Sequence, residues 1–201
     1  MRPSLIVVHY TAMSTCRDAR ARLCDPTAEV SAHWLVSETG HTEALVNESA
    51  RAWHAGAGEW AGITDVNSAS IGIELANTGT QPFPEPQMAA LETLLAEIMA
   101  RWTIPAHRVI AHSDMTPMRK SDPGPRFDWH RLAISGLSVW PSPGHARLAD
   151  FVPALRKFGY PQAPDTDLLA VFRLRFRPWA HGPLDSTDAA LAFDLATRFG
   201  M

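Results

Sequence analysis

LIVVH, residues 5–9, opens the part of the chain that decides its fold. Leu5 to Val8 form a continuous apolar run that includes β-branched residues, which is typical of a strand buried on both faces. The run ends at the polar residue His9. We therefore expect a buried strand near the N-terminus with an imidazole at its end.

Further elements can be placed outward from this strand. SIGIELA, residues 70–76, alternates in apolar character, so a strand there places Glu74 on the face opposite its Ile and Leu side chains. The apolar spacing over residues 88–102 predicts a helix with one buried stripe. Residues 109–110, Val-Ile, predict a short strand that delivers His112.

Two shorter patterns lie in the first part of the chain. Ser14 is expected to cap a helix that runs to Leu23. Residues 32–37 and 43–47 favour a β-hairpin around a Thr-Gly turn.

The character of the chain changes after Trp129. Residues 138–147, SVWPSPGHAR, are rich in Pro, Gly and Ser, as a linker or domain boundary is. Three helical patterns follow, over residues 147–158, 166–177 and 186–199. We therefore predict a first domain over residues 1–137, a linker over 138–147 and a small three-helix bundle over 148–201.

Composition limits the classes of partner. The chain has 201 residues and a net charge of −3 with no block of Lys and Arg, which argues against nucleic-acid binding. No segment approaches the roughly 18 apolar residues of a membrane span. The N-terminal apolar run is too short for a signal-peptide core. We expect a cytoplasmic protein; a periplasmic or secreted location would require a leader outside this sequence or a non-standard export route.

Three residues suggest a metal site. His9 and His112 each follow a short apolar strand, and Asp122 lies in a rigid Pro-Gly turn. Two imidazoles and a carboxylate make a three-ligand zinc set with the fourth position open. The spacing alone leaves structural roles open, because an aspartate before proline also starts turns.

A set of motifs adds a family resemblance that covers nearly all of residues 4–132. These motifs are VVHYTA (7–12), AWHAG (52–56), SIGIEL (70–75), AHSD (111–114) and RKSDPGPRFDW (119–129). With them the chain resembles the zinc-dependent N-acetylmuramoyl-L-alanine amidases of type 2, a superfamily that includes the peptidoglycan recognition proteins.

The resemblance implies an α/β (α+β) fold, with a mixed β-sheet flanked by helices and a groove at the sheet's edge. It implies one Zn²⁺ per chain, held by His9, His112 and Asp122. Glu74 and Lys120 match the family's catalytic carboxylate and its oxyanion-stabilising base.

Three more positions follow from the same resemblance. Trp53 and His54 resemble the wall of the family's groove, which implies that they contact substrate. Met118 stands where close relatives often have Gly, so the loop before Lys120 is expected to depart from the family pattern.

The C-terminal segment carries a second resemblance. GY (159–160), Asp165 and VFRLRFRP (171–178) resemble a peptidoglycan-binding three-helix module. A packing appendage without a ligand is the alternative.

The activity implied is hydrolysis of the amide between N-acetylmuramic acid, or its 1,6-anhydro form, and L-alanine of peptidoglycan stem peptides. The partner is then peptidoglycan or a muropeptide, during cell-wall recycling or turnover. Two alternatives stay open: a non-catalytic muropeptide recognition module, and a phage-type or secreted wall-lytic amidase. The sequence does not fix the oligomeric state.

Overall fold

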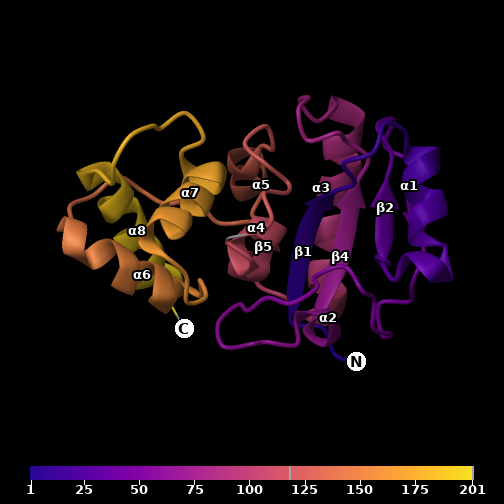
Figure 1. Ribbon diagram of the computed structural model, residues 1–201, viewed down its shortest axis with the longest axis horizontal. Helices are drawn as coiled ribbons and strands as arrows, with labels where there is room; N and C mark the ends of the chain where they lie inside the picture. Colours follow the sequence, from indigo (N-terminus) through magenta and orange to yellow (C-terminus); the bar gives the residue numbers. More distant parts are fainter. Residues whose placement is uncertain (118, 201) are drawn as a thin grey trace.

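Figure 1 shows the computed structural model of the chain, which is built around a five-stranded sheet in the order β3-β2-β4-β1-β5. The central strand β1 (Leu5–Tyr10) pairs in parallel with β4 (Ser70–Leu75) and with β5 (Val109–Ala111). On the other side of β4, β2 (Trp34–Val36) is parallel to it and β3 (Thr42–Ala44) is antiparallel to β2. The sheet is therefore mixed, as predicted.

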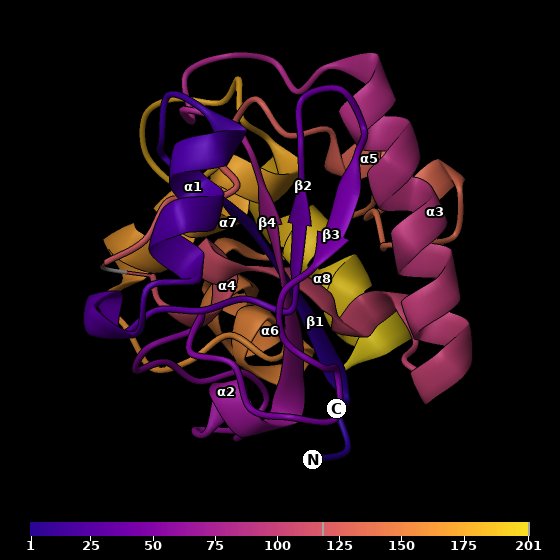
Figure 2. The same ribbon diagram turned by 90° about the vertical axis from the view of Figure 1, so that its right-hand side faces the viewer.

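Helices surround this sheet. The first part of the chain contains α1 (Cys16–Leu23), α2 (Val66–Ala69), α3 (Glu85–Trp102), α4 (His112–Met115) and α5 (Trp129–Ile134), with short 3-10 turns η1 (Pro26–Ala28) and η2 (Ala106–Arg108). The last part contains η3 (Leu148–Asp150), α6 (Phe151–Phe158), α7 (Asp165–Phe176) and α8 (Ser186–Phe199). Figure 2 shows α1 and α3 on opposite sides of the sheet.

The apolar run that begins β1 is continuous because both faces of this strand are covered. Ile6 and Val8 belong to a core cluster with the apolar stripe of α3. Leu5 and Val7 belong to a second cluster, which continues into the C-terminal helices through side chains such as Phe172. A two-sided strand of this kind requires apolar residues at every position.

The first helix begins one residue later than expected. Thr15, rather than Ser14, is the N-cap of α1, and its hydroxyl accepts from the backbone N–H of Asp18 at 3.1 Å. Both residue types are good caps, so the sequence alone could not choose between neighbours.

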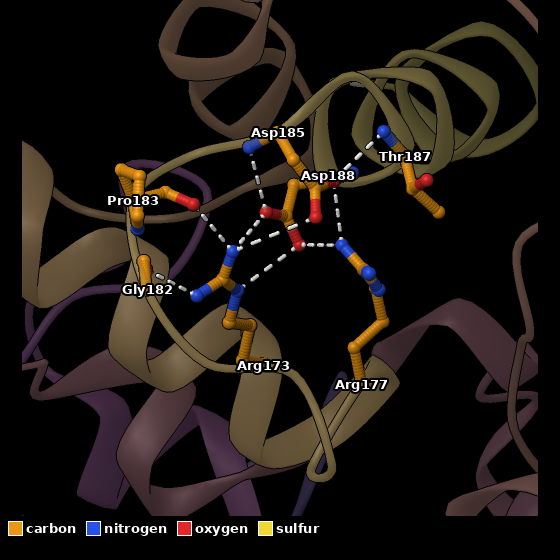
Figure 3. A network of polar contacts seen from close by, with 7 residues as sticks. All are labelled: Arg173, Arg177, Gly182, Pro183, Asp185, Thr187 and Asp188. Carbon is orange, nitrogen blue, oxygen red and sulfur yellow. Dashed lines mark hydrogen bonds and ion pairs between the residues drawn. The ribbon is translucent and has the colours of Figure 1, made fainter.

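The C-terminal helices lie beyond the edge strand β5 (Figure 1). The α7–α8 connection is held by a buried polar network, in which Arg173 and Arg177 both donate to the carboxylate of Asp188 (Figure 3). Arg173 also donates to the carbonyl oxygens of Gly182 at 2.7 Å and Pro183 at 2.9 Å. The three predicted helices therefore form, and ion pairs fix the loop between two of them.

The first residues of the segment between the two parts are packed against the rest of the chain. Ser138 and Val139 are buried, and the backbone N–H of Ser142 donates to Asp194 of α8 at 2.8 Å. The division of the chain at residues 138–147 stays a prediction, and one apolar cluster extends across it.

The structure describes residues 1–117 and 119–200. The expectation for Met118 lies outside the described residues. Within these ranges, no helix combines the length and the apolar character that crossing a bilayer needs.

Candidate active site

The site begins with two histidines at the carboxyl ends of adjacent parallel strands. His9 is the fifth residue of β1, and His112 is the first residue of α4, directly after β5. Because β1 and β5 are parallel neighbours, their carboxyl ends meet at one edge of the sheet. The positions therefore follow from where the two apolar strands stop.

Asp122 approaches the same edge from the loop after α4. Its backbone carbonyl accepts from the N–H of Ser113 at 3.0 Å, and its peptide bond to Pro123 is cis. The aspartate before proline thus both shapes the turn and directs a carboxylate at the histidines. All three predicted ligands are buried, with exposed fractions of 1% for His9, 3% for His112 and 7% for Asp122.

The three residues place one atom each in a tight triangle. Nδ1 of His9, Nδ1 of His112 and Oδ2 of Asp122 are 3.0 Å apart in every pairing. Two ligand atoms of a tetrahedral zinc ion are about 3.3 Å apart, since each lies about 2.0–2.1 Å from the metal. The spacing therefore fits a single small cation.

The hydrogen bond that His112 makes outside the triangle determines which of its ring nitrogens keeps a lone pair. Its Nε2 lies 3.0 Å from the backbone carbonyl of Ala55, which can only accept. Nε2 therefore carries a proton, so in the neutral ring Nδ1 is the nitrogen whose lone pair faces the carboxylate of Asp122. Two acceptors at 3.0 Å without a proton between them favour a bound cation.

His9 is also suited to ligate as a neutral imidazole. Burial, together with the neighbouring His112, lowers the pKa of His9 to about 4. The ring is therefore uncharged at neutral pH, and an uncharged imidazole is the form that binds metals. The donor set of two imidazoles and one carboxylate is the kind that catalytic zinc sites use.

Glu74 lies beside the triangle. It is the register partner of His9 on the neighbouring strand β4, so the two side chains leave the same face of the sheet. Its Oε2 is buried without a hydrogen-bond partner among the described residues. Burial, then the nearby charge of Asp122, raises the pKa of Glu74 to about 8. A carboxyl group with a pKa near the working pH can both accept and release a proton.

The site opens into a pocket of about 410 Å³. Glu74 and the three predicted ligands line it, and Lys120 and Trp53 line its wall. Lys120 is exposed, and Trp53 is 53% exposed. Both side chains are therefore free to meet a ligand that enters the pocket.

His54 differs from its neighbour Trp53 because it is buried. Both of its ring nitrogens lie close to protein atoms, Nδ1 at 2.9 Å from Nε2 of His9 and Nε2 at 3.2 Å from Oγ of Ser70. Burial, followed by the charges of His9 and His33, lowers the pKa of His54 well below its ordinary value. His54 lines the pocket, but both of its ring nitrogens are engaged with protein atoms.

Sequence reasoning missed two groups around the site. Tyr10 lines the pocket, and its phenol lies 3.1 Å from Oγ of Ser121; its position directly after His9 was the available signal. Asp114, inside the α4 helix, accepts from Tyr160 Oη at 2.7 Å and from Arg175 of α7. No local sequence pattern marks the contact between Asp114 and Arg175.

The C-terminal helices enclose another pocket, of about 770 Å³. Its lining is largely apolar and includes Phe151, Leu169 and Leu174. Its lining residues lie between Leu148 and Leu184, whereas those of the first pocket lie between His9 and Asp122.

Comparison with known proteins places this chain in a family. Residues 1–125 match the family model described as N-acetylmuramoyl-L-alanine amidase. The chain is 34% identical to the N-acetylmuramoyl-L-alanine amidase AmiD of Escherichia coli (strain K12), over 99% of this chain and 84% of that protein. It is 42% identical to the 1,6-anhydro-N-acetylmuramyl-L-alanine amidase AmpD of Haemophilus influenzae, over 53% of this chain and 58% of that protein.

Solved structures agree with these matches. The complex of AmiD from E. coli with the substrate anhydro-N-acetylmuramic acid-L-Ala-D-gamma-Glu-L-Lys aligns with a TM-score of 0.90 at 33% identity, covering 100% of this chain and 91% of that one. The crystal structure of AmpDh3 from Pseudomonas aeruginosa in complex with anhydromuramic pentapeptide aligns with a TM-score of 0.89 at 30% identity, covering 100% and 94%. Both alignments include the C-terminal helices.

Proposed function

The chain belongs to the N-acetylmuramoyl-L-alanine amidase family, and from this premise we propose that it cleaves the amide between muramic acid and L-alanine of a stem peptide. We propose the 1,6-anhydro form of muramic acid as the preferred sugar, because the two aligned complexes hold anhydro-muramyl peptides.

One observation carries the proposal. Three buried ligand atoms lie 3.0 Å from one another, and Glu74, whose Oε2 has no hydrogen-bond partner among the described residues, lines the same pocket. A binding module needs shape and hydrogen bonds, but it does not need a proton acceptor with a raised pKa at a metal site. The arrangement therefore favours a hydrolase over the non-catalytic recognition module.

The roles of the residues follow from their positions. His9, His112 and Asp122 would hold Zn²⁺, which when bound polarises a carbonyl and lowers the pKa of water. Glu74 accepts a proton from the attacking water as the new C–O bond forms at the carbonyl carbon. It then delivers that proton to the nitrogen of L-alanine as the C–N bond breaks, so the products are a carboxylic acid and a free amine.

Lys120 and Trp53 act at the rim of the pocket. The ammonium of Lys120 balances the negative charge that develops on the carbonyl oxygen, and a preorganised donor of this kind is typically worth about 2.7–4 kcal/mol in the barrier. The exposed ring of Trp53 offers an apolar surface to the sugar or the peptide.

Product analysis tests the function. The purified protein is incubated with anhydro-muropeptides and, separately, with intact sacculi, and mass spectrometry identifies the products. We expect free stem peptides that begin with L-alanine, released faster from the soluble fragment. Release from sacculi alone would favour a wall-lytic amidase, and no release from either would favour a recognition module.

Metal analysis tests the site. Protein purified without chelator is expected to contain about one zinc ion per chain. His9→Ala and Asp122→Ala should each lose zinc and activity together. Unchanged zinc content in either variant would remove that residue from the ligand set.

We also propose that the C-terminal helices bind peptidoglycan, as their resemblance to a peptidoglycan-binding module implies. The apolar pocket that Leu169 and Leu174 line supports this role. Leu169→Lys should weaken cosedimentation with insoluble sacculi and leave turnover of soluble muropeptides unchanged. Equal cosedimentation of the variant and the native protein would favour the packing appendage.

A further inference from the structure

The ring of His54 is held inside the protein on the same face of the sheet as the predicted metal ligands. Its Nδ1 lies 2.9 Å from Nε2 of His9, and its Nε2 lies 3.2 Å from Oγ of Ser70. With an exposed fraction of 9% and both nitrogens engaged, the ring has no polar atom left for a substrate. Its contact with His9 is on the side of that ring opposite to the metal-facing Nδ1.

The direction of each hydrogen bond in this chain can be assigned from its far end. Oγ of Ser70 lies 2.6 Å from the carbonyl oxygen of Val66, which can only accept, so Ser70 donates its single proton there. Oγ of Ser70 must then accept from the Nε2–H of His54. A neutral imidazole has one N–H, so Nδ1 of His54 accepts from the Nε2–H of His9. His9 is thereby left with a lone pair on Nδ1.

That lone pair is the one the metal site needs. Nδ1 of His9 lies 3.0 Å from both Nδ1 of His112 and Oδ2 of Asp122. With the proton of His112 on Nε2, all three inward atoms are acceptors. The chain of hydrogen bonds that starts at Val66 therefore leaves none of the three metal-facing atoms with a proton.

The backbone around His54 serves the second histidine as well. Oδ1 of Asn67 accepts from the N–H groups of His54 at 3.1 Å and Ala55 at 2.9 Å. The carbonyl of Ala55 in turn accepts from Nε2–H of His112 at 3.0 Å. One two-residue segment thus presents an acceptor to each of the two metal-facing histidines.

Gly72 makes room for this arrangement. A Cβ atom at Gly72 would lie 2.3 Å from Cγ of His54, well inside the contact distance of two carbon atoms. The ring therefore lies directly on the backbone of β4. Any side chain at this position would move His54 away from His9.

We propose that His54 is a positioning residue of the metal site: through Ser70 and Val66 it fixes the tautomer and the orientation of His9. This inference rests on the zinc site of the proposed function, and it gives His54 a role other than the substrate contact that the family resemblance implies. Partners of metal-ligating histidines typically change metal affinity 10- to 100-fold when they are removed.

Zinc affinity tests the proposal through a readout other than activity. Competition with a chelator at pH 7 should show a roughly 10- to 100-fold weaker Kd for His54→Ala. His54→Gln, which keeps an acceptor and a donor, should recover part of the loss. Gly72→Ala should weaken zinc binding although it removes no polar atom, and circular dichroism should show that each variant is folded.

A serine pair supplies a matched control. Ser70→Ala removes the fixed end of the chain and should weaken zinc binding. Ser37→Ala removes another buried hydroxyl, which contacts Thr39 and the N–H of His41 in the hairpin, and should leave zinc affinity unchanged. Native zinc affinity in both His54→Ala and Ser70→Ala would overturn the proposal.

The tautomers can be measured in the native protein without any substitution. Long-range ¹H–¹⁵N spectra of the metal-free protein at neutral pH should place the proton of His9, His54 and His112 on Nε2. A proton on Nδ1 of His54 would overturn the proposal even if the variants fail to fold. If the native protein binds no zinc, the zinc site of the proposed function fails. These spectra would still show in which direction the hydrogen bonds from His9 to Val66 run.

Discussion

Arg175 provides a sharp test of how the C-terminal helices relate to the active site. Its guanidinium leaves α7, lies fully buried, and donates to the carboxylate of Asp114, to the carbonyl of Val109 at 3.0 Å and to Oγ of Ser138 at 3.2 Å. Asp114 is also fully buried and lies in the one-turn helix that begins with His112. An ion pair without exposure to water thus joins α7 to the element that carries a predicted zinc ligand.

Arg175→Met keeps much of the side-chain volume and removes the charge. Among the described residues, the carboxylate of Asp114 then retains the N–H of Ala111 at 2.9 Å and the phenol of Tyr160 at 2.7 Å as its partners. Breaking a buried pair by removing one partner typically costs about 3–5 kcal/mol, because it leaves an uncompensated charge out of water. We expect a loss of this size in the free energy of unfolding, with weaker zinc binding as α4 shifts.

Denaturant unfolding, followed by circular dichroism and by zinc release, measures both effects. Arg147→Met is the control, since the ion pair of Arg147 with Asp150 is exposed and should contribute little. Adding Asp114→Asn to Arg175→Met removes the stranded charge and should restore part of the stability. Native stability in Arg175→Met would refute the expected cost. If Arg175→Met loses stability but releases zinc at the same denaturant concentration as the native protein, the C-terminal helices are not coupled to the site.

Other predictions concern the pocket. Glu74→Gln and Lys120→Met should each keep zinc by metal analysis but lose on the order of a hundredfold or more in kcat, because they act on the transition state; native kcat would exclude that residue from the mechanism. Trp53→Ala should raise KM with kcat nearly unchanged in steady-state kinetics, and the reverse pattern would contradict a binding role. In the metal-free protein, the pKa of Glu74 is raised from 4.5 to about 8. The stabilisation from its protonated form is therefore complete below about pH 4.5 and lost as the pH rises through about 8, by at most about 5 kcal/mol. Denaturation of the metal-free native protein should show this decline and Glu74→Gln should not; parallel curves would contradict the raised pKa.

Much of the sheet could be predicted because its strands are marked by local patterns. The buried run before His9 and the alternation over residues 70–75 both became strands, and Val109 to Ala111 delivers His112 as expected. The three C-terminal helices were also visible in their apolar spacing. Each of these features depends on residues close together in the chain, which is where periodicity carries information.

Contacts between distant segments could not be predicted in the same way. Arg175 lies in a helix where arginines alternate with apolar residues, so its sequence context suggests a solvated side chain. The fold instead buries it against Asp114, 61 positions away. The inward ring of His54 is a similar case, because only the position of Gly72 across the sheet shows that the ring has room to turn towards His9.

The face of β4 that carries Ser70, Gly72 and Glu74 unites these observations. These residues are the register partners of Leu5, Val7 and His9 on β1, so they leave the sheet on the side where the ligands converge. Ser70 accepts from the ring of His54, Gly72 leaves space for that ring, and Glu74 presents its carboxyl group to the pocket. A small residue between two polar ones is a poor choice for strand stability, because glycine weakens a strand interior. The alternation therefore reflects the chemistry of the site on one face and the core beneath α3 on the other.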